Sequence, residues 1–186
     1  MGDERADEAA RSRSRERWLR QQAVEEASFA GIAVDLAERG VPVALHTSTG
    51  RTYRGSIVAV ATDFLVIAAG PAAAGVDGRP GPVTLIALAA VSLLRPAAEV
   101  SGPASVTEPL RDRRAPADIS MASALAGLAG DRPDVQLGVA GSADPLAGEL
   151  RAVGGDVVTL RLATDPPRSV YVRLASVTEC SLFGSG

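Results

Sequence analysis

The sequence predicts a mainly β protein with helices (α+β), built from two tandem copies of one unit, a short helix followed by a small five-stranded barrel. Three observations predict it: an internal repeat, a Pro-rich break between the copies, and a supply of small apolar residues. Of the 186 residues 46% are apolar, yet there are only one Trp, two Tyr and three Phe. Cores made of Ala, Val and Leu suit strands and Ala-rich helices better than a large aromatic pocket.

The repeat aligns residues 28–45 with residues 120–137 at one constant offset, so that Ser28 meets Ser120 and Leu45 meets Leu137. After a gain of one residue, 53–57 align with 146–150. Further on, 85–91 align with 171–177, after a connection about seven residues longer in the first copy. Because the extra length is a Gly/Pro-rich stretch, a loop insertion in a duplicated unit explains it.

Four segments follow from this repeat. Residues 1–27 are a charged N-terminal extension, predicted to form a long helix, and 28–95 hold the first helix and barrel. Residues 96–117 contain prolines 96, 103, 109 and 116, a density that disfavours both helix and central strand and predicts a linker. Residues 118–183 hold the second helix and barrel.

Each unit is expected to begin with a capped helix. Ser28 and Ser120 are suited to accept hydrogen bonds from the first free amides of a helix, and Gly40 is suited to end the first one. The first helix should bury a one-sided apolar stripe, made of Phe29, Ile32, Ala33 and Leu36.

Five strands should follow in the first copy, covering 43–47, 53–57, 64–68, 83–87 and 91–94. Glycine stands in mid-strand at Gly55 and again at the equivalent Gly148. Since a strand gains nothing from glycine intrinsically, we expect a sharp bend or a close approach of backbone there, as at the corner of a barrel.

This strand pattern resembles the Sm-like family, the small barrels that include bacterial Hfq and the Sm and LSm proteins. The first Sm motif, a Gly, an apolar residue, x-Gly-x-Leu and further apolar positions, is matched in copy one by Gly50, Tyr53, Gly55, Ile57, Val60 and Ile67. Copy two matches it with Leu146, Gly148, Leu150, Val153 and Leu160. The resemblance covers roughly 43–95 and 135–183 and implies barrels that assemble through strand edges; an SH3-like barrel is the neighbouring alternative.

The residues that bind uridine in that family are not matched. Ala61 and Leu65 stand where the family has its acidic residue and Asn, and the second copy has Gly154 and Val158 there. The second motif is also absent, because residues 87–91 read ALAAV and residues 173–177 read RLASV. The resemblance therefore implies a fold without the family's known ligand contacts.

Composition narrows the classes of function. A single cysteine, Cys180, excludes an internal disulfide and a multi-thiolate zinc site. A net charge of −3 argues against a general nucleic-acid coat protein. With no apolar leader and no long apolar run, we expect a cytoplasmic protein that is neither exported nor inserted in a membrane.

Candidate catalytic groups are sparse. His46, the only histidine, has no nucleophile placed beside it by spacing and is better explained as a half-exposed strand residue. Asp63 and Asp156 occupy equivalent turns, where capping explains both more simply than acid–base chemistry. The Gly-rich run 75–81 lacks the Gly-Lys-Ser/Thr ending that cradles phosphate. We infer no enzyme, cofactor, metal or small-molecule substrate.

Contacts with RNA or with an acidic partner have candidates in one basic segment and in the first barrel: Arg11, Arg13, Arg15, Arg17, Trp18, Arg20, Arg51 and Arg54. Arginines would bind phosphates and Trp18 would offer a stacking surface. The alternative is a solvated helix in which these arginines pair with neighbouring carboxylates.

Three functional hypotheses result. The first is a non-enzymatic interaction or scaffold protein, whose barrels bind a protein partner or a second copy through exposed strand edges. The second is an RNA-binding regulatory protein that uses the Arg-rich helix and the first barrel. The third is an enzyme whose site the sequence does not reveal.

Overall fold

Both predicted helices are present, and a serine begins each of them. Helix α2 spans Phe29–Glu38, and the Ser28 hydroxyl accepts a hydrogen bond from the Gly31 amide at 3.0 Å. Helix α3 spans Met121–Ala129, and Ser120 accepts one from the Ser123 amide at 3.2 Å. Gly40, just beyond α2, has a φ of +61°, which glycine adopts without strain. The predicted caps are confirmed.

The structure, a computed structural model, describes residues 28–69, 82–97 and 118–182. The first half (28–97) contributes strands β1 (Pro42–Thr47), β2 (Thr52–Val60), β3 (Phe64–Ala68), β4 (Val83–Ala87) and β5 (Val91–Pro96). The second half (118–182) contributes strands β6 (Asp134–Val139), β7 (Leu146–Val153), β8 (Val157–Leu162), β9 (Arg168–Arg173) and β10 (Val177–Leu182). A 3₁₀ turn joins the last two strands of each half, η2 (Leu88–Ala90) and η3 (Leu174–Ser176).

The two halves pair their strands in the same register. Val43 lies opposite Gly55 in β1·β2, and Val135 lies opposite Gly148 in β6·β7. The strand order within the halves is β5-β1-β2-β3-β4 and β10-β6-β7-β8-β9. Equivalent residues of the two copies can therefore be assigned from the pairing itself.

The two mid-strand glycines lie where neighbouring backbone comes very close. A Cβ on Gly148 would lie 2.6 Å from the carbonyl oxygen of Arg161, and one on Gly55 would collide with the carbonyl oxygen of Ala68. No side chain can turn aside to relieve either contact, because backbone atoms make both. The close approach expected from the sequence is confirmed at both positions.

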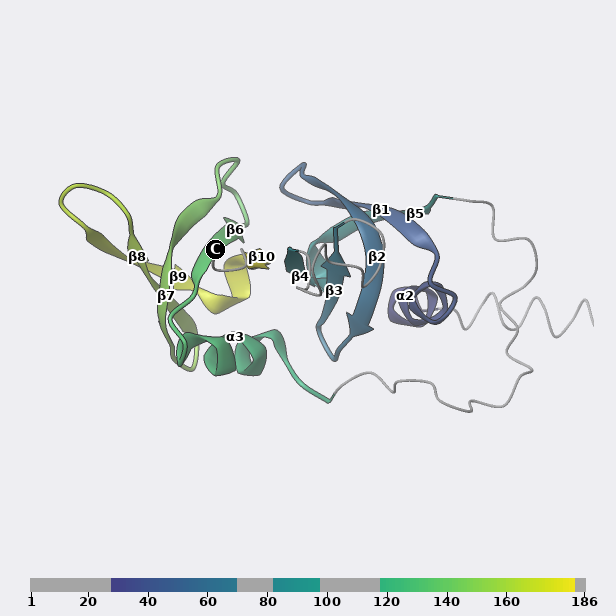
Figure 1. Ribbon diagram of the computed structural model, residues 1–186, viewed down its shortest axis with the longest axis horizontal. Coiled ribbons are helices and arrows are strands. Elements are labelled where there is room, and N and C mark those ends of the chain that lie inside the picture. The colour runs from purple at the N-terminus through teal and green to yellow at the C-terminus, as the bar shows by residue number, and fades with distance from the viewer. Residues whose placement is uncertain (1–27, 70–81, 98–117, 183–186) are drawn as a thin grey trace, which may run out of the picture.

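The prediction of two separate barrels is wrong, because the ten strands form one continuous antiparallel sheet. In neither half does the fourth strand pair with the fifth. Instead β4 of the first half pairs with β10 of the second, with Leu85 opposite Cys180 and Ile86 opposite Glu179. The physical reason is that the bent five-stranded unit leaves both of its edges open, and β10 satisfies the backbone groups of β4. Figure 1 shows β4 and β10 side by side between the halves.

The predicted long N-terminal helix is likewise not found in the described residues, where the α-helices are only ten and nine residues long. Residues 1–27 and most of the predicted linker lie outside the described ranges. Pro96, assigned to the linker, instead ends strand β5.

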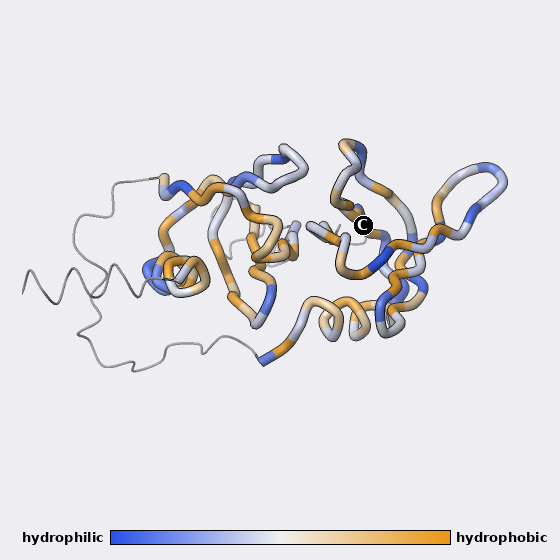
Figure 2. The backbone as a smooth tube through the Cα atoms, turned by 180° about the vertical axis from the view of Figure 1, so that it is seen from behind, coloured by the Kyte–Doolittle hydropathy of each residue, from blue (hydrophilic) through white to orange (hydrophobic). Residues whose placement is uncertain are grey.

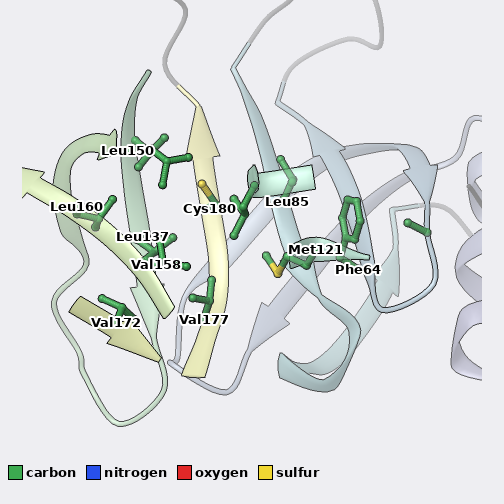
Figure 3. Close-up of a cluster of buried hydrophobic side chains, with 13 residues drawn as sticks. Phe64, Leu85, Met121, Leu137, Leu150, Val158, Leu160, Val172, Val177 and Cys180 are labelled. Carbon is green, nitrogen blue, oxygen red and sulfur yellow. The ribbon is translucent and has the colours of Figure 1, made fainter. Parts of the chain in front are cut away.

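The core is shared across the halves in a way that two independent domains would not be. One apolar cluster combines Phe64 and Leu85 of the first half with Met121, Leu125 and other residues of the second (Figure 3). A second cluster, around Leu45, Leu65 and Ile86, belongs to the first half alone. Strand β4 thus faces one cluster with Leu85 and the other with Ile86.

Helix α2 buries less of its apolar stripe than the sequence predicts. Ala33 and Leu36 are buried, but Phe29 is 38% and Ile32 is 48% exposed. In α3, which is mostly apolar in Figure 2, Met121 holds the place of Phe29 and is buried beside the first half. Phe29 stays exposed because no described segment packs against the start of α2 as the first half packs against the start of α3.

Candidate assembly interface

The pairing of β4 with β10, hereafter the joint, places several sequence-distant side chains together. Its apolar face brings Cys180 against Leu85, and both are buried. On the other face the hydroxyls of Thr84 and Ser181 hydrogen bond at 2.9 Å across the strands. Glu179 lies on the same face as Ser181, two residues earlier in β10 and opposite Ile86.

Glu179 is the most unusual side chain of the joint, because it is a carboxylate with no exposed surface. Its Oε1 accepts a hydrogen bond from the Thr49 hydroxyl at 3.1 Å and lies 3.8 Å from the Arg51 guanidinium. Its Oε2 has no hydrogen-bond partner among the described residues. A buried carboxylate is costly unless it is paired, so Thr49 and Arg51 offset part of the cost of desolvating it.

Glycine makes room for this carboxylate. Gly138, on the neighbouring strand β6, lies opposite Glu179. A Cβ at that position would overlap the Glu179 carboxyl group. Gly138 is therefore required by the volume of Glu179.

Arg51 ties the first half to the second by more than its ion pair. It donates a hydrogen bond to the Gln136 side chain at 3.3 Å, and its guanidinium lies 5.8 Å from the centre of the Tyr53 ring. Together Thr49, Arg51 and Tyr53 of the first half surround Glu179 of the second, with Gln136 at the margin. These five residues are called the joint cluster below.

Tyr53 has a buried hydroxyl that makes no well-formed hydrogen bond within the part of the chain that the structure describes, although it lies near Glu179 and Ser181. Burial, reinforced by the negative charge of Glu179, raises the pKa of Tyr53 to about 12. Burial alone raises the pKa of the Cys180 thiol to about 12. Both groups remain protonated at neutral pH, and a buried neutral thiol is a poor nucleophile.

A second link between the halves runs through Asp63. Its carboxylate accepts a hydrogen bond from the Met121 amide at 2.7 Å, at the start of α3, and the Thr62 amide bonds the carbonyl of Ile119 at 3.3 Å. The sequence predicts that Asp63 caps its own turn, and it instead caps the helix of the other half. Asp156, its equivalent, shares with Asp63 only a contact within its own half: the carbonyl of Asp63 accepts a hydrogen bond from the Leu88 amide, and that of Asp156 accepts one from the Leu174 amide.

Two strands of the described chain are paired on one side only, β5 with β1 and β9 with β8. These free edges are of the same two kinds that meet at the joint, because β9 corresponds to β4 and β5 corresponds to β10. Each presents a large apolar side chain to solvent: Leu93 of β5 is 44% exposed and Tyr171 of β9 is 73% exposed.

The exposed apolar residues coincide with positions that the joint buries. Leu93 is equivalent to Glu179, and Tyr171 is equivalent to Leu85. Glu179 and Leu85 are both buried. Phe29 is equivalent to Met121, also buried. Each free end of the sheet in the described ranges thus exposes apolar side chains at positions equivalent to those that the joint buries.

The candidate residues from the sequence are only partly placed. Arg11, Arg13, Arg15, Arg17, Trp18 and Arg20 lie outside the described residues. Arg51 is engaged in the joint cluster, whereas Arg54 is exposed on β2. The two arginines therefore do not form one shared basic surface.

His46 and Cys180 behave as the sequence suggests. The His46 imidazole makes a 3.1 Å contact with the Thr52 hydroxyl on the exposed side of β1, and Cys180 is a core residue. Within the described ranges, no three His, Cys, Asp or Glu side chains come together as metal ligands. Within the same ranges, no helix is long and apolar enough to cross a membrane.

Sequence reasoning missed the joint cluster. A signal was present, since Glu179 is an acidic residue of the final strand whose equivalent in the first copy is the apolar Leu93. A difference between otherwise matching copies marks a position where their surroundings differ.

In comparisons with known proteins, no family model matches the chain, and neither a curated protein nor a solved structure matches it.

Proposed function

We propose that the protein is a non-enzymatic assembly module, which joins copies of itself head to tail through the free edges β5 and β9. One observation carries the proposal: the described chain already contains one joint of this kind, and its sheet ends in one unpaired edge of each type. An edge of unpaired amides and carbonyls is a template for another strand.

The joint supplies the register of the proposed contact. By equivalence with Glu179·Ile86 and Cys180·Leu85, Leu93 of one copy would lie opposite Val172 of the next, and Leu94 opposite Tyr171. The ladder would end before Pro96, which has no amide hydrogen to donate.

The helices support the same arrangement. With copies placed as the halves are, Phe29 would pack as Met121 does, and Asp156 would cap α2 of the next copy as Asp63 caps α3. The contact is heterologous, because unlike surfaces meet. Such contacts produce rings when the rotation closes and open chains when it does not, so assemblies larger than a dimer are expected.

Light scattering coupled to size-exclusion chromatography tests the proposal over a range of protein concentrations. We expect a discrete or growing oligomer that nuclease treatment leaves unchanged. Tyr171→Ser should lower the mass toward that of one chain, whereas Ile119→Ser is the matched control, since Ile119 is 38% exposed but lies on neither free edge. A monomer at every concentration, or an oligomer that nuclease dissolves, would contradict the proposal; the second result would favour the RNA-binding alternative.

A further inference from the structure

The joint and the proposed contact between copies differ in chemistry at one set of equivalent positions. In the joint within the chain, Glu179 faces Arg51 and Tyr53 and occupies the space beside Gly138. At the free ends the residues at the paired positions have changed. Leu93 corresponds to Glu179, Leu146 to Tyr53 and His46 to Gly138. Arg51 lies in the β1–β2 turn, which differs in length from the β6–β7 turn, so the strand pairing gives it no counterpart.

These changes are mutually consistent. Leu93 in the proposed contact would meet Leu146, an apolar partner for an apolar side chain. A glutamate there would meet Leu146 in place of Tyr53, and the β6–β7 turn, residues 140–145, contains no basic residue to take the part of Arg51. Burying a carboxylate without a cation or a full set of donors is strongly unfavourable.

The reverse exchange is also unfavourable. If β5 of another copy paired with β4, Leu93 would cover Arg51, Thr49 and Tyr53. These three residues would then lack the carboxylate that they surround in the joint. A desolvated guanidinium without a counter-ion is costly in the same way. These contacts therefore favour β10 over β5 as the partner of β4, and β5 over β10 as the partner of β9.

We propose that Glu179, with Thr49, Arg51 and Tyr53 as its receptor, is the specificity determinant that reserves β4 for β10 and leaves β9 for β5 of a second copy. This inference rests on the proposed self-assembly for its second part only. Selectivity obtained through a repulsive element as well as an attractive one is a general way to choose among similar partners. In this chain it keeps first and second halves in strict alternation.

Disulfide trapping with the native Cys180 measures the choice directly. In the correct joint Cys180 faces Leu85, so it meets position 171 of another copy only if β10 has paired with the wrong strand, β9. The reporter is the full chain with Tyr171→Cys, unfolded in urea, refolded at high concentration and mildly oxidised. Dimers linked between positions 171 and 180 are then quantified on a non-reducing gel and by mass spectrometry.

We expect these dimers to be scarce with Glu179 and to rise at least about tenfold when Glu179→Leu is added, because the carboxylate no longer opposes pairing with β9. Glu179→Gln, which keeps the size and an acceptor for Thr49, should give an intermediate amount. Leu85→Cys combined with Glu179→Leu controls for folding: a disulfide to Cys180 within one chain shows that the correct joint still forms.

Equal amounts of the 171–180 dimer with and without the Glu179→Leu substitution would overturn the inference. That result is independent of the oligomeric state of the unmodified protein. A monomeric wild type would contradict the proposed function alone, since the wrong pairing is scored during refolding whether or not native copies associate.

Discussion

Replacing Gly55 with alanine should destabilise the fold more than the corresponding change at Gly148. The Cβ added at Gly55 would collide with the carbonyl oxygen of Ala68 and lie 2.8 Å from its carbonyl carbon. At Gly148 the nearest atoms, both of Arg161, are at 2.6 and 3.1 Å. In both cases only a shift of paired strands relieves the overlap.

The magnitude follows from the kind of contact. Forcing extra atoms into a packed site costs typically about 1–3 kcal/mol, and backbone contacts belong at the upper end. We expect a loss of about 3 kcal/mol for Gly55→Ala and about 2 kcal/mol for Gly148→Ala. For a chain of this size each kcal/mol lowers the melting temperature by about 2–4 °C.

Urea unfolding followed by circular dichroism measures both losses. The matched control is Gly127→Ala, inside α3, where an added Cβ would meet no neighbouring atom of the described residues within 4 Å. It should stabilise the protein by about 0.5–1 kcal/mol, since alanine loses less backbone entropy in a helix than glycine does. If Gly55→Ala unfolded at the urea concentration of the wild type, the close approach of β2 and β3 at this position would be refuted.

Three further predictions concern other parts of the molecule. Cys180 should resist thiol reagents at pH 8 in the native protein and react once the chain is unfolded, because burial raises its pKa to about 12; rapid native labelling would contradict this. The free energy of unfolding should fall as pH rises from about 9 toward 12. The unfolded chain releases the protons of Cys180 and Tyr53 at their ordinary pKa values of 9.0 and 10.0, whereas the folded chain retains them. Urea midpoints that do not move with pH in this range would contradict this prediction. Asp63→Ala should cost about 1 kcal/mol by removing the hydrogen bond to the first amide of α3, which Ser120 does not satisfy. Asp156→Ala should leave the stability of one chain nearly unchanged and weaken assembly. Equal effects on stability would show that the two positions are not distinguished in this way.

The repeat makes much of the local structure predictable. Serine before an Ala-rich helix identifies both caps, because the hydroxyl satisfies an amide that the helix leaves free. Gly55 and Gly148, at equivalent positions in two strands, identify the close backbone approach. These features depend on a few neighbouring residues, and the sequence contains those residues explicitly.

The continuous sheet is not predictable in the same way. Strand β4 has the same alternation of apolar residues whether it closes its own unit or pairs with β10, because both arrangements bury Leu85 and Ile86. Which edge meets which depends on the bend of the whole five-stranded unit, a property that no local pattern expresses. The exposure of Phe29 escapes prediction for the same reason.

The joint cluster is less predictable than the helix caps and more predictable than the continuous sheet. Glu179, where the first copy has Leu93, signals a special environment, but Thr49, which donates a hydrogen bond to it, lies 130 residues away in the chain. Comparing the copies position by position, Glu179 with Leu93 and Tyr53 with Leu146, links the two sites once the register is known.

The contact between copies is tested most directly by cysteines placed across it. In a Cys180→Ala background, Leu94→Cys with Tyr171→Cys sets a thiol on each free edge, where the proposed register places them opposite each other at a separation that a disulfide spans. Mild oxidation should then link chains into a ladder of covalent oligomers. Leu93→Cys with Tyr171→Cys, whose side chains would face opposite sides of the sheet, should not. Chains that stay unlinked in the first variant, or link equally in both, would contradict the pairing of β5 with β9.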